Sequence, residues 1–292
     1  MMKSQALNTL VYSVEEDIAT ISLNRPEKLN AVTGEMLTEL IEVFDYSDTD
    51  DQVKAVIVTG SGRAFCAGAD LSSGSDALDF DDDNDPHVLK VNGIVLDSGG
   101  RVALRIFNSL KPVISACNGP AVGIGATIQL PMDIRLASTS AKFGFPFSRR
   151  GIVPESVSSW FLPRIVGIST ALEWCYSGRI FSADEALQCG LVRSLHQPEE
   201  LLPDARKLAR EIADNTAPVS IALTRQLLWR MMTAGHPMAA HRAESLAVQS
   251  RGRSDDVREG IMAFLEKRSA DYPNTVSQDL PDVFPEWQEP EF

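Results

Sequence analysis

A buried strand, a glycine-containing turn and the start of a helix follow one another in PVISACNGPAVGIGATIQL, residues 112–130. The segment VISAC has the apolar composition of an interior strand. Gly123, Gly125 and Ala126 are small, so a ligand can approach the backbone closely. The N–H groups at the start of a helix also carry a partial positive charge. This stretch therefore predicts a site that stabilises a developing oxyanion.

The same order of strand, turn and helix is predicted further upstream. The strand-like segment VKAVIVT at residues 53–59 leads through a glycine-rich turn into AFCAGADL at Ala64–Leu71. Residues 10–14 and 18–23 alternate apolar and polar side chains, which indicates a half-buried hairpin. Thr33 is expected to cap a helix with apolar residues at helical spacing. Mixed strands and helices in this order predict an α/β fold, a sheet with helices packed on it.

The rest of the chain divides by composition. Residues 1–197 are predicted to form the α/β core, with helices at 155–165 and 169–176 and a further helix that is capped by Ser182 and ends at Gly190. Residues 72–100, which contain DALDFDDDNDPH, are interpreted as a variable acidic surface loop. Residues 198–270 are predicted to be a helical region, and residues 271–292 a proline-rich acidic tail over the surface. Phe284 and Trp287 in that tail could dock on a partner subunit.

Composition excludes several classes of function. With 27 Lys and Arg against 40 Asp and Glu, the net charge is −13, which argues against nucleic acid or anionic membrane as a partner. The four Cys form no C-x-x-C pair and the four His form no H-E-x-x-H motif, so neither a metal site nor a disulfide framework is predicted. No signal peptide or membrane-length apolar run is evident, and a cytoplasmic location is expected.

Competing ligand motifs are not matched. A dinucleotide fingerprint, G-x-G-x-x-G, would require glycine where Ile128 stands, and no suitably placed ribose-binding acid follows. The sequence contains neither G-x-x-x-x-G-K-[ST] nor G-x-S-x-G. Nucleotide-phosphate hydrolysis of the Walker type and α/β-hydrolase chemistry therefore lack support.

Five segments, taken together and in order, resemble the crotonase (enoyl-CoA hydratase/isomerase) superfamily. They are NRPEKLNAV at Asn24–Val32, AFCAGADL at Ala64–Leu71, KPVISACNGPAVGIG at Lys111–Gly125, AKFGFPFSRRGIVPE at Ala141–Glu155, and AFLEKR at Ala263–Arg268. The resemblance covers residues 8–270. It implies a spiral of repeated ββα units with a C-terminal helical region, and trimers that often pair into hexamers. It also implies an acyl-CoA thioester substrate and no separate cofactor, since coenzyme A is part of the substrate.

The resemblance places an oxyanion hole on two backbone N–H groups, those of Ala69 and Ile124, at the expected starts of two helices. Ile124 stands where many members have glycine, yet its N–H remains available. Such a pair polarises a thioester carbonyl and stabilises an enolate.

The base is less uniform across the superfamily. Hydratases use two Glu that flank the C2–C3 bond, and those positions here hold Thr127 and Phe147, which are expected to line the substrate pocket. Glu155 instead matches the catalytic Glu of peroxisomal-type Δ3,Δ2-enoyl-CoA isomerases, a match that extends to NGPAVGI and PFS-x-x-G-x-x-PE-x-x-SS. From the local sequence alone, Glu155 could simply open a helix after Pro154 and meet its dipole. Several aromatic residues are candidates for apolar pocket walls or for core: Phe143, Phe145, Phe147, Trp160 and Phe161.

Coenzyme A is polyanionic, so this acidic chain needs local cations to hold it. The resemblance places the adenine and phosphates over a loop with Arg25, Lys28 and Ala31. It assigns the adenine and pantetheine side to Ala67, Asp70 and Leu71. It also assigns Phe264 and Lys267, in the last predicted helix, to contacts with coenzyme A, commonly across a subunit boundary. Without the motif, Lys28 and Lys267 would be ordinary solvated lysines.

Three functions remain open on these grounds. The first is an acyl-CoA isomerase that moves a double bond from C3 to C2, with Glu155 as the proton carrier. The second is a hydratase-like lyase or another single-carboxylate reaction, with Thr127 orienting water. The third is a non-catalytic acyl-CoA-binding homologue. A three-fold homo-oligomer is expected from the resemblance and from an apolar stripe at helical spacing: Leu223, Leu227, Leu228, Met231 and Met232.

Overall fold

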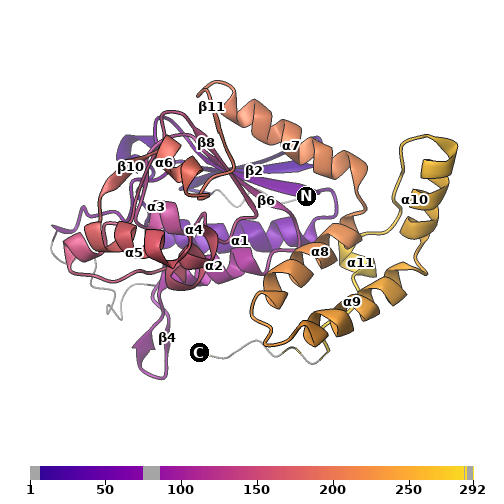
Figure 1. Cartoon of the computed structure of the whole chain (residues 1–292). Coiled ribbons are helices and arrows are strands. Elements are labelled where there is room, and N and C mark those ends of the chain that lie inside the picture. Colours follow the sequence, from indigo (N-terminus) through magenta and orange to yellow (C-terminus); the bar gives the residue numbers. More distant parts are fainter. Residues whose placement is uncertain (1–6, 75–85, 286, 288–291) are drawn as a thin grey trace.

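The computed structural model describes residues 7–74, 86–285, 287 and 292, and two β-sheets organise most of this chain (Figure 1). The larger sheet has six strands in the order β1-β2-β3-β6-β8-β11, and the smaller has three in the order β10-β9-β7. The strands of the larger sheet are β1 (Leu10–Glu15), β2 (Ile18–Leu23), β3 (Ala55–Gly60), β6 (Val113–Cys117), β8 (Ile134–Ser138) and β11 (Ser194–His196). Those of the smaller are β7 (Ala121–Val122), β9 (Lys142–Gly144) and β10 (Ile180–Ser182).

The predicted hairpin and α/β fold are confirmed. β1 and β2 pair antiparallel with Leu10 opposite Leu23, and the remaining neighbours in the larger sheet run parallel. β6 leads into β7 and β8 into β9, so the chain passes twice from the larger sheet to the smaller one. This alternation between two sheets, with helices between passes, is the spiral that the resemblance implied.

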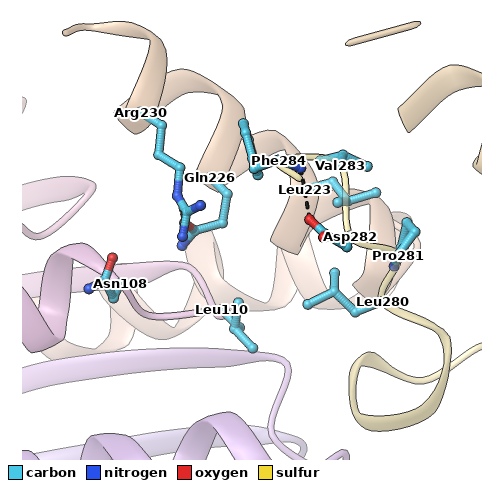
Figure 2. Close-up of a pocket in the computed structure, with 10 residues that line it drawn as sticks. All are labelled: Asn108, Leu110, Leu223, Gln226, Arg230, Leu280, Pro281, Asp282, Val283 and Phe284. Carbon is cyan, nitrogen blue, oxygen red and sulfur yellow. Dashed lines mark hydrogen bonds between the residues drawn. The ribbon is translucent and has the colours of Figure 1, made fainter. Parts of the chain in front are cut away.

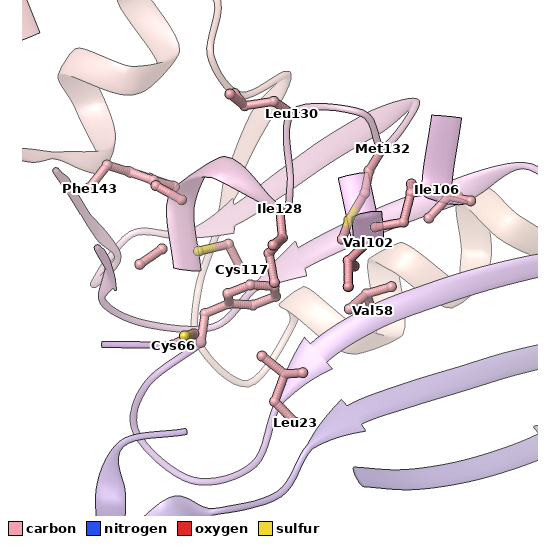
Figure 3. Close-up of a cluster of buried hydrophobic side chains, with 14 of the residues drawn as sticks. Leu23, Val58, Cys66, Val102, Ile106, Cys117, Ile128, Leu130, Met132 and Phe143 are labelled. Carbon is pink, nitrogen blue, oxygen red and sulfur yellow. The ribbon is translucent and has the colours of Figure 1, made fainter. Parts of the chain in front are cut away.

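Helices cover both faces of the larger sheet. Val56 and Val58 of β3 point into the main core, while Ala55 and Ile57 point to the other face and pack against α7 (Leu201–Asn215). The main core is filled from several elements, and Figure 3 shows Cys66 and Cys117 near Ile128 and Phe143 within it. The helices around this core are α1 (Gly34–Thr49), α2 (Ser98–Phe107), α3 (Ile124–Thr127), α4 (Ser158–Val166), α5 (Ile168–Ser177) and α6 (Ala183–Gln188). Thr33 caps α1 by accepting the Met36 N–H, as predicted.

The later helices extend to one side, seen at the right of Figure 1. They are α8 (Pro218–Met231), α9 (Pro237–Arg251) and α10 (Asp255–Glu266), followed by the short α11 (Val276–Asp279). α8 is joined to the body by Arg225, whose buried guanidinium pairs with Asp133 at 2.9 Å and donates to the carbonyls of Ile106 and Phe107. The helical region is therefore firmly attached at α8.

The prediction of a loop over residues 72–100 is wrong for its second half. Residues 90–95 form the hairpin of β4 (Lys90–Val91) and β5 (Ile94–Val95), and Ser98 begins α2. The reason is local: Asp97 accepts the Gly99 N–H and caps the helix. Residues 75–85, the most acidic part, lie outside the described residues.

The C-terminal segment does not simply run over the surface. Val283 is buried with Val219 and Leu223 of α8, and the Arg230 guanidinium lies over the rings of Phe284 and Trp287 at 4.7 and 5.1 Å. Between this segment and α8 lies a cavity of about 310 Å³ (Figure 2). It is lined by Asn108, Leu110, Leu223, Gln226, Arg230 and residues 280–284, none of which is a predicted catalytic or coenzyme A-binding residue. The aromatic residues thus dock within the chain.

Over the described residues, none of the helices has both the length and the apolar character needed to cross a membrane.

Candidate active site

The two predicted oxyanion turns lie directly against each other. Cys66 and Ala121 form a parallel bridge, and the Val122 N–H donates to the Cys66 carbonyl at 3.0 Å. A Cβ at Gly125 would lie 2.2 Å from that same carbonyl oxygen, so only glycine permits this approach. The bridge and the glycine together bring Ala69 and Ile124, far apart in sequence, to the same side of the core.

Both predicted donors are free to bind a ligand, although their settings differ from the prediction. Ile124 is the first residue of α3, as expected, but Ala69 does not begin a helix. Ala69 instead forms a β-bridge with Val32. The Val32 N–H donates to the Gly68 carbonyl, and the Val32 carbonyl accepts the Asp70 N–H. Backbone groups alternate in direction along an extended segment, so the Ala69 N–H faces the opposite way. Within residues 7–74 and 86–285, neither N–H donates a hydrogen bond.

Glu155 stands on a distorted turn, and the expectation that it opens a helix is wrong. α4 begins three residues later, at Ser158. Ser156 and Val157 both adopt left-handed backbone conformations, with φ of 54° and 56°. For a β-branched residue such as Val157 this conformation is strained, which is typical of residues at functional sites. Glu155 therefore lies outside α4. A favourable interaction with the dipole of a helix that Glu155 opens does not account for a carboxyl group at this position.

Each carboxyl oxygen of Glu155 accepts a hydrogen bond from a hydroxyl. Thr127 Oγ1 donates to Oε1 at 2.7 Å, and Ser156 Oγ donates to Oε2 in a very short contact. Burial raises the pKa of Glu155 to about 7. The hydrogen bonds from Ser156 and Thr127 lower this pKa, and the nearby charge of Asp97 raises it, but burial has the largest effect. A carboxyl group with this pKa can accept and return protons near neutral pH.

The raised pKa predicts how activity depends on pH. As the base that the resemblance implies, Glu155 would have to be ionised to accept a proton, so kcat/KM should rise with pH and level off above a midpoint near 7. An ordinary exposed glutamate would give a midpoint near 4.3. Measurement of kcat/KM between pH 5 and 9 checks this prediction, and a profile that is flat down to pH 5 would contradict it.

Asp97 and Gly99 complete the site, and sequence reasoning missed both. Asp97 Oδ2 accepts the Ser156 N–H at 2.5 Å. A Cβ at Gly99 would lie 2.2 Å from Ser156 Oγ and 2.8 Å from Glu155 Oε2. The first turn of α2 therefore passes so close to the Glu155 carboxyl group that only glycine fits at position 99. The only sequence signal for this contact was an Asp two residues before a glycine pair. That pattern indicates a helix cap but does not indicate that Asp97 also contacts Ser156.

A family model described as Enoyl-CoA hydratase/isomerase matches residues 13–275. The chain belongs to this family. The predicted resemblance is thereby confirmed, and the chain is an acyl-CoA enzyme.

Individual relatives carry different names. Enoyl-CoA hydratase ACTT3 of Alternaria alternata is 40% identical over 264 residues, covering 90% of this chain and 85% of the relative. The 1,2-epoxyphenylacetyl-CoA isomerase of Escherichia coli (strain K12) is 35% identical over 279 residues, covering 89% and 96%. Among solved structures, the enoyl-CoA hydratase from Bacillus anthracis has a TM-score of 0.80 at 27% identity and covers 90% of this chain and 98% of that chain.

The residues expected to bind coenzyme A are only partly free to do so. Arg25 pairs with Asp70 at 2.8 Å and donates to the Ala31 carbonyl at 2.6 Å. Hydrogen bonds from Ser72, and from Arg25, lower the pKa of Asp70 to about 2, so the pair stays charged. Arg25 thus shapes the loop while Lys28, which is exposed, remains available for phosphate.

The second group for coenzyme A lies close to this loop. Ala67 donates its N–H to the Leu29 carbonyl at 3.0 Å, which ties the first oxyanion turn to the loop. Leu71 is 46% exposed. The turn with Ala67 and the loop with Lys28 are therefore joined by a backbone hydrogen bond.

Phe264 and Lys267 lie far from Glu155 within one chain. Both are exposed on α10 and its C-terminal cap, and Phe264 is 82% exposed. α10 is at the far right of Figure 1, whereas α3 and α4 are at the left centre. Within the described chain, α10 is therefore remote from the Glu155 turn.

The aromatic candidates are mainly core. Phe147 is 4% exposed and its ring is 6.5 Å from that of Phe145, within a stack that continues to Trp174. Phe161 is also buried, and its ring lies against those of Trp160 and Phe107. Across the described residues, no group of three or more His, Cys, Asp or Glu side chains is arranged to hold a metal ion.

Proposed function

We propose that this enzyme is a Δ3,Δ2-enoyl-CoA isomerase in fatty-acid or related acyl-CoA metabolism. The Ala69 and Ile124 N–H groups hold the thioester oxygen, and Glu155 removes a proton from C2. The resulting dienolate spreads its charge over C2 and C4. The same carboxylic acid then returns a proton at C4, which completes the 1,3-shift with no net change in atoms.

One observation carries this proposal: the partly buried carboxyl group of Glu155, with a pKa of about 7, accepts a hydrogen bond from Thr127 of α3, beside the two predicted oxyanion turns. Thr127 and Phe147 replace the two glutamates that hydratases use. Thr127 donates to Glu155, and Phe147 packs in the core. A one-base proton shift needs no positioned water. The intact donors and base also argue against a merely binding homologue.

Hydration is the second candidate, favoured by the relatives' names. The 40% identical Alternaria alternata relative is named an enoyl-CoA hydratase. In that alternative, Thr127 would orient a water and Glu155 would supply the only carboxylate at the reacting carbons. This arrangement leaves no separate acid and base for the two ends of the double bond.

Product mass separates the two candidates. The enzyme is incubated in turn with trans-2-enoyl-CoA and 3-enoyl-CoA, and the thioester products are analysed by mass spectrometry and ultraviolet absorbance. Isomerisation leaves the mass unchanged and creates a conjugated thioester, whereas hydration adds one water. Efficient hydration with no double-bond shift would reject the isomerase proposal.

Lys267→Ala should raise KM for the CoA ester several-fold and leave kcat nearly unchanged. The proposed contact with coenzyme A is the same in the ground state and the transition state, so its loss does not affect the chemical step. Steady-state kinetics checks this, with Lys207→Ala, on α7, as a control for the loss of one surface charge. An unchanged KM in Lys267→Ala would reject the role.

A three-fold homo-oligomer is proposed because the described chain places Phe264 away from its own site and leaves apolar residues exposed on α10. These are Ile261, Met262, Phe264 and Leu265. The predicted stripe on α8 contributes less than expected, since Leu223 is buried against Val283 and the exposed part is Leu228 and Met232. Light scattering should give three or six times the mass of one chain. A monomer at all concentrations would contradict this.

A further inference from the structure

Asp97 joins two elements that meet at the base. Its Oδ1 accepts the Gly99 N–H at 2.9 Å, in the first turn of α2, and its Oδ2 accepts the Ser156 N–H at 2.5 Å. One carboxylate therefore bridges a helix N-terminus and the turn that carries Glu155. The two bridged segments are 59 residues apart in the sequence.

The turn requires such a restraint. Ser156 and Val157 are both left-handed, a conformation that non-glycine residues keep only when their surroundings hold them. Ser156 is fully buried, so its N–H needs an acceptor other than water. Asp97 supplies that acceptor. With the Ser156 main chain held, Ser156 Oγ is directed at Glu155 Oε2.

We propose that Asp97 is a positioning residue for proton transfer: it fixes the Ser156 turn against α2 and so holds Glu155 in front of the two oxyanion donors. The inference rests on the proposed role of Glu155 as the base. In this proposal Asp97 acts through the two backbone N–H groups that it accepts, and Glu155 alone exchanges a proton with the substrate.

The charge of Asp97 provides an independent readout. Among the described residues, Asp97 is the charged group that shifts the pKa of Glu155, while the charge of Glu155 in turn raises the pKa of the Cys66 thiol. Burial raises the pKa of Cys66 to about 12, so this thiol is neutral at ordinary pH. The negative charge of Asp97 raises the pKa of Glu155. Removal of that charge should lower the pKa of Glu155 and move the acid limb of the pH profile to lower pH.

Asp97→Ser separates positioning from helix capping. Serine is as good a helix N-cap as aspartate, so α2 keeps its cap. Its single short hydroxyl is uncharged and cannot accept from Gly99 and Ser156 together. We expect kcat to fall about 10- to 100-fold, KM to stay within about two-fold, and the kcat/KM midpoint to fall by about half a pH unit or more.

The assay follows deuterium uptake from D2O into 3-hexenoyl-CoA by mass spectrometry, which requires only the base and the oxyanion donors. Ser182→Ala is the matched control, since Ser182 caps α6 by accepting the Glu185 N–H. That variant loses a cap away from Glu155 and should keep the wild-type kcat and midpoint.

An Asp97→Ser protein with wild-type kcat and midpoint would overturn the proposal, even if its melting temperature were lower. The proposed reaction fails separately: a wild type that takes up deuterium but does not move the double bond refutes isomerisation. The comparison of Asp97→Ser with the wild type then still decides the role of Asp97.

Discussion

Glu155→Gln should abolish conversion of 3-enoyl-CoA to 2-enoyl-CoA, with a loss of at least about 10⁴-fold in kcat, because it removes the one group proposed to carry the proton. Glutamine has the same shape and can still bond to Thr127 and Ser156. Binding of a CoA ester should therefore remain within a few-fold of the wild type. Steady-state kinetics and calorimetric titration with a saturated acyl-CoA check both statements. Full isomerase activity in this variant would overturn the assignment.

The Glu155→Gln substitution should also change the stability of the protein. The melting transition that measures this change shows in addition that the variant is folded. The Glu155 pKa is about 7 in the native protein and near its usual 4.5 when unfolded. The native state therefore binds the proton more tightly. Stability from this group is complete below pH 4.5 and is lost as pH rises through 7, by about 3 kcal/mol in all. Glu155→Gln is uncharged throughout, so its melting temperature relative to wild type should be higher at pH 8 than at pH 5.

Ala69→Pro should lower kcat about 10²- to 10³-fold, because proline has no N–H to donate to the thioester oxygen. The substitution removes no hydrogen bond from the described chain, because the Ala69 N–H donates none within the described residues. The initial rate of conversion of 3-enoyl-CoA to 2-enoyl-CoA at saturating substrate measures the change in kcat.

Ala69→Gly is the matched control for the oxyanion donor. It removes the side chain, keeps the N–H and should retain most of the activity, since the proposed contact is made by the backbone. Ile124→Pro tests the second donor at the first position of α3, where proline is well tolerated. Folded Ala69→Pro protein with its full rate would show that this N–H does not hold the oxygen.

Local patterns in the sequence were sufficient to predict the first hairpin, the start of α1 and the family. Alternating residues at 10–14 and 18–23 predicted the β1–β2 hairpin, although only β1 is half-buried and β2 is buried on both faces, between β1 and β3. Thr33 predicted the start of α1, because its hydroxyl satisfies a nearby N–H. The motifs at Ala64–Leu71 and Lys111–Gly125 led to the family. Each of these signals acts over a few residues, or matches a pattern shared by relatives.

Local patterns were misleading where a long-range contact overrides them. Pro154 followed by Glu155 looks like a helix start, yet the hydrogen bond from Ser156 to Asp97 stabilises a left-handed turn, and α4 begins at Ser158. Ala69 was expected to begin a helix, yet pairing with Val32 keeps it extended. In both places a partner more than thirty residues away determines the backbone conformation.

The sequence by itself determined the family, and it pointed to Ala69, Ile124 and Glu155 as candidate site residues. Only the tertiary structure decided that Thr127, Ser156 and Asp97 surround that base and that burial raises its pKa to about 7. The physical reason is that desolvation and hydrogen bonding depend on which distant segments enclose a group. Gly99 shows this directly: its missing Cβ leaves room for Glu155 only because α2 folds back over a turn more than fifty residues further along the chain.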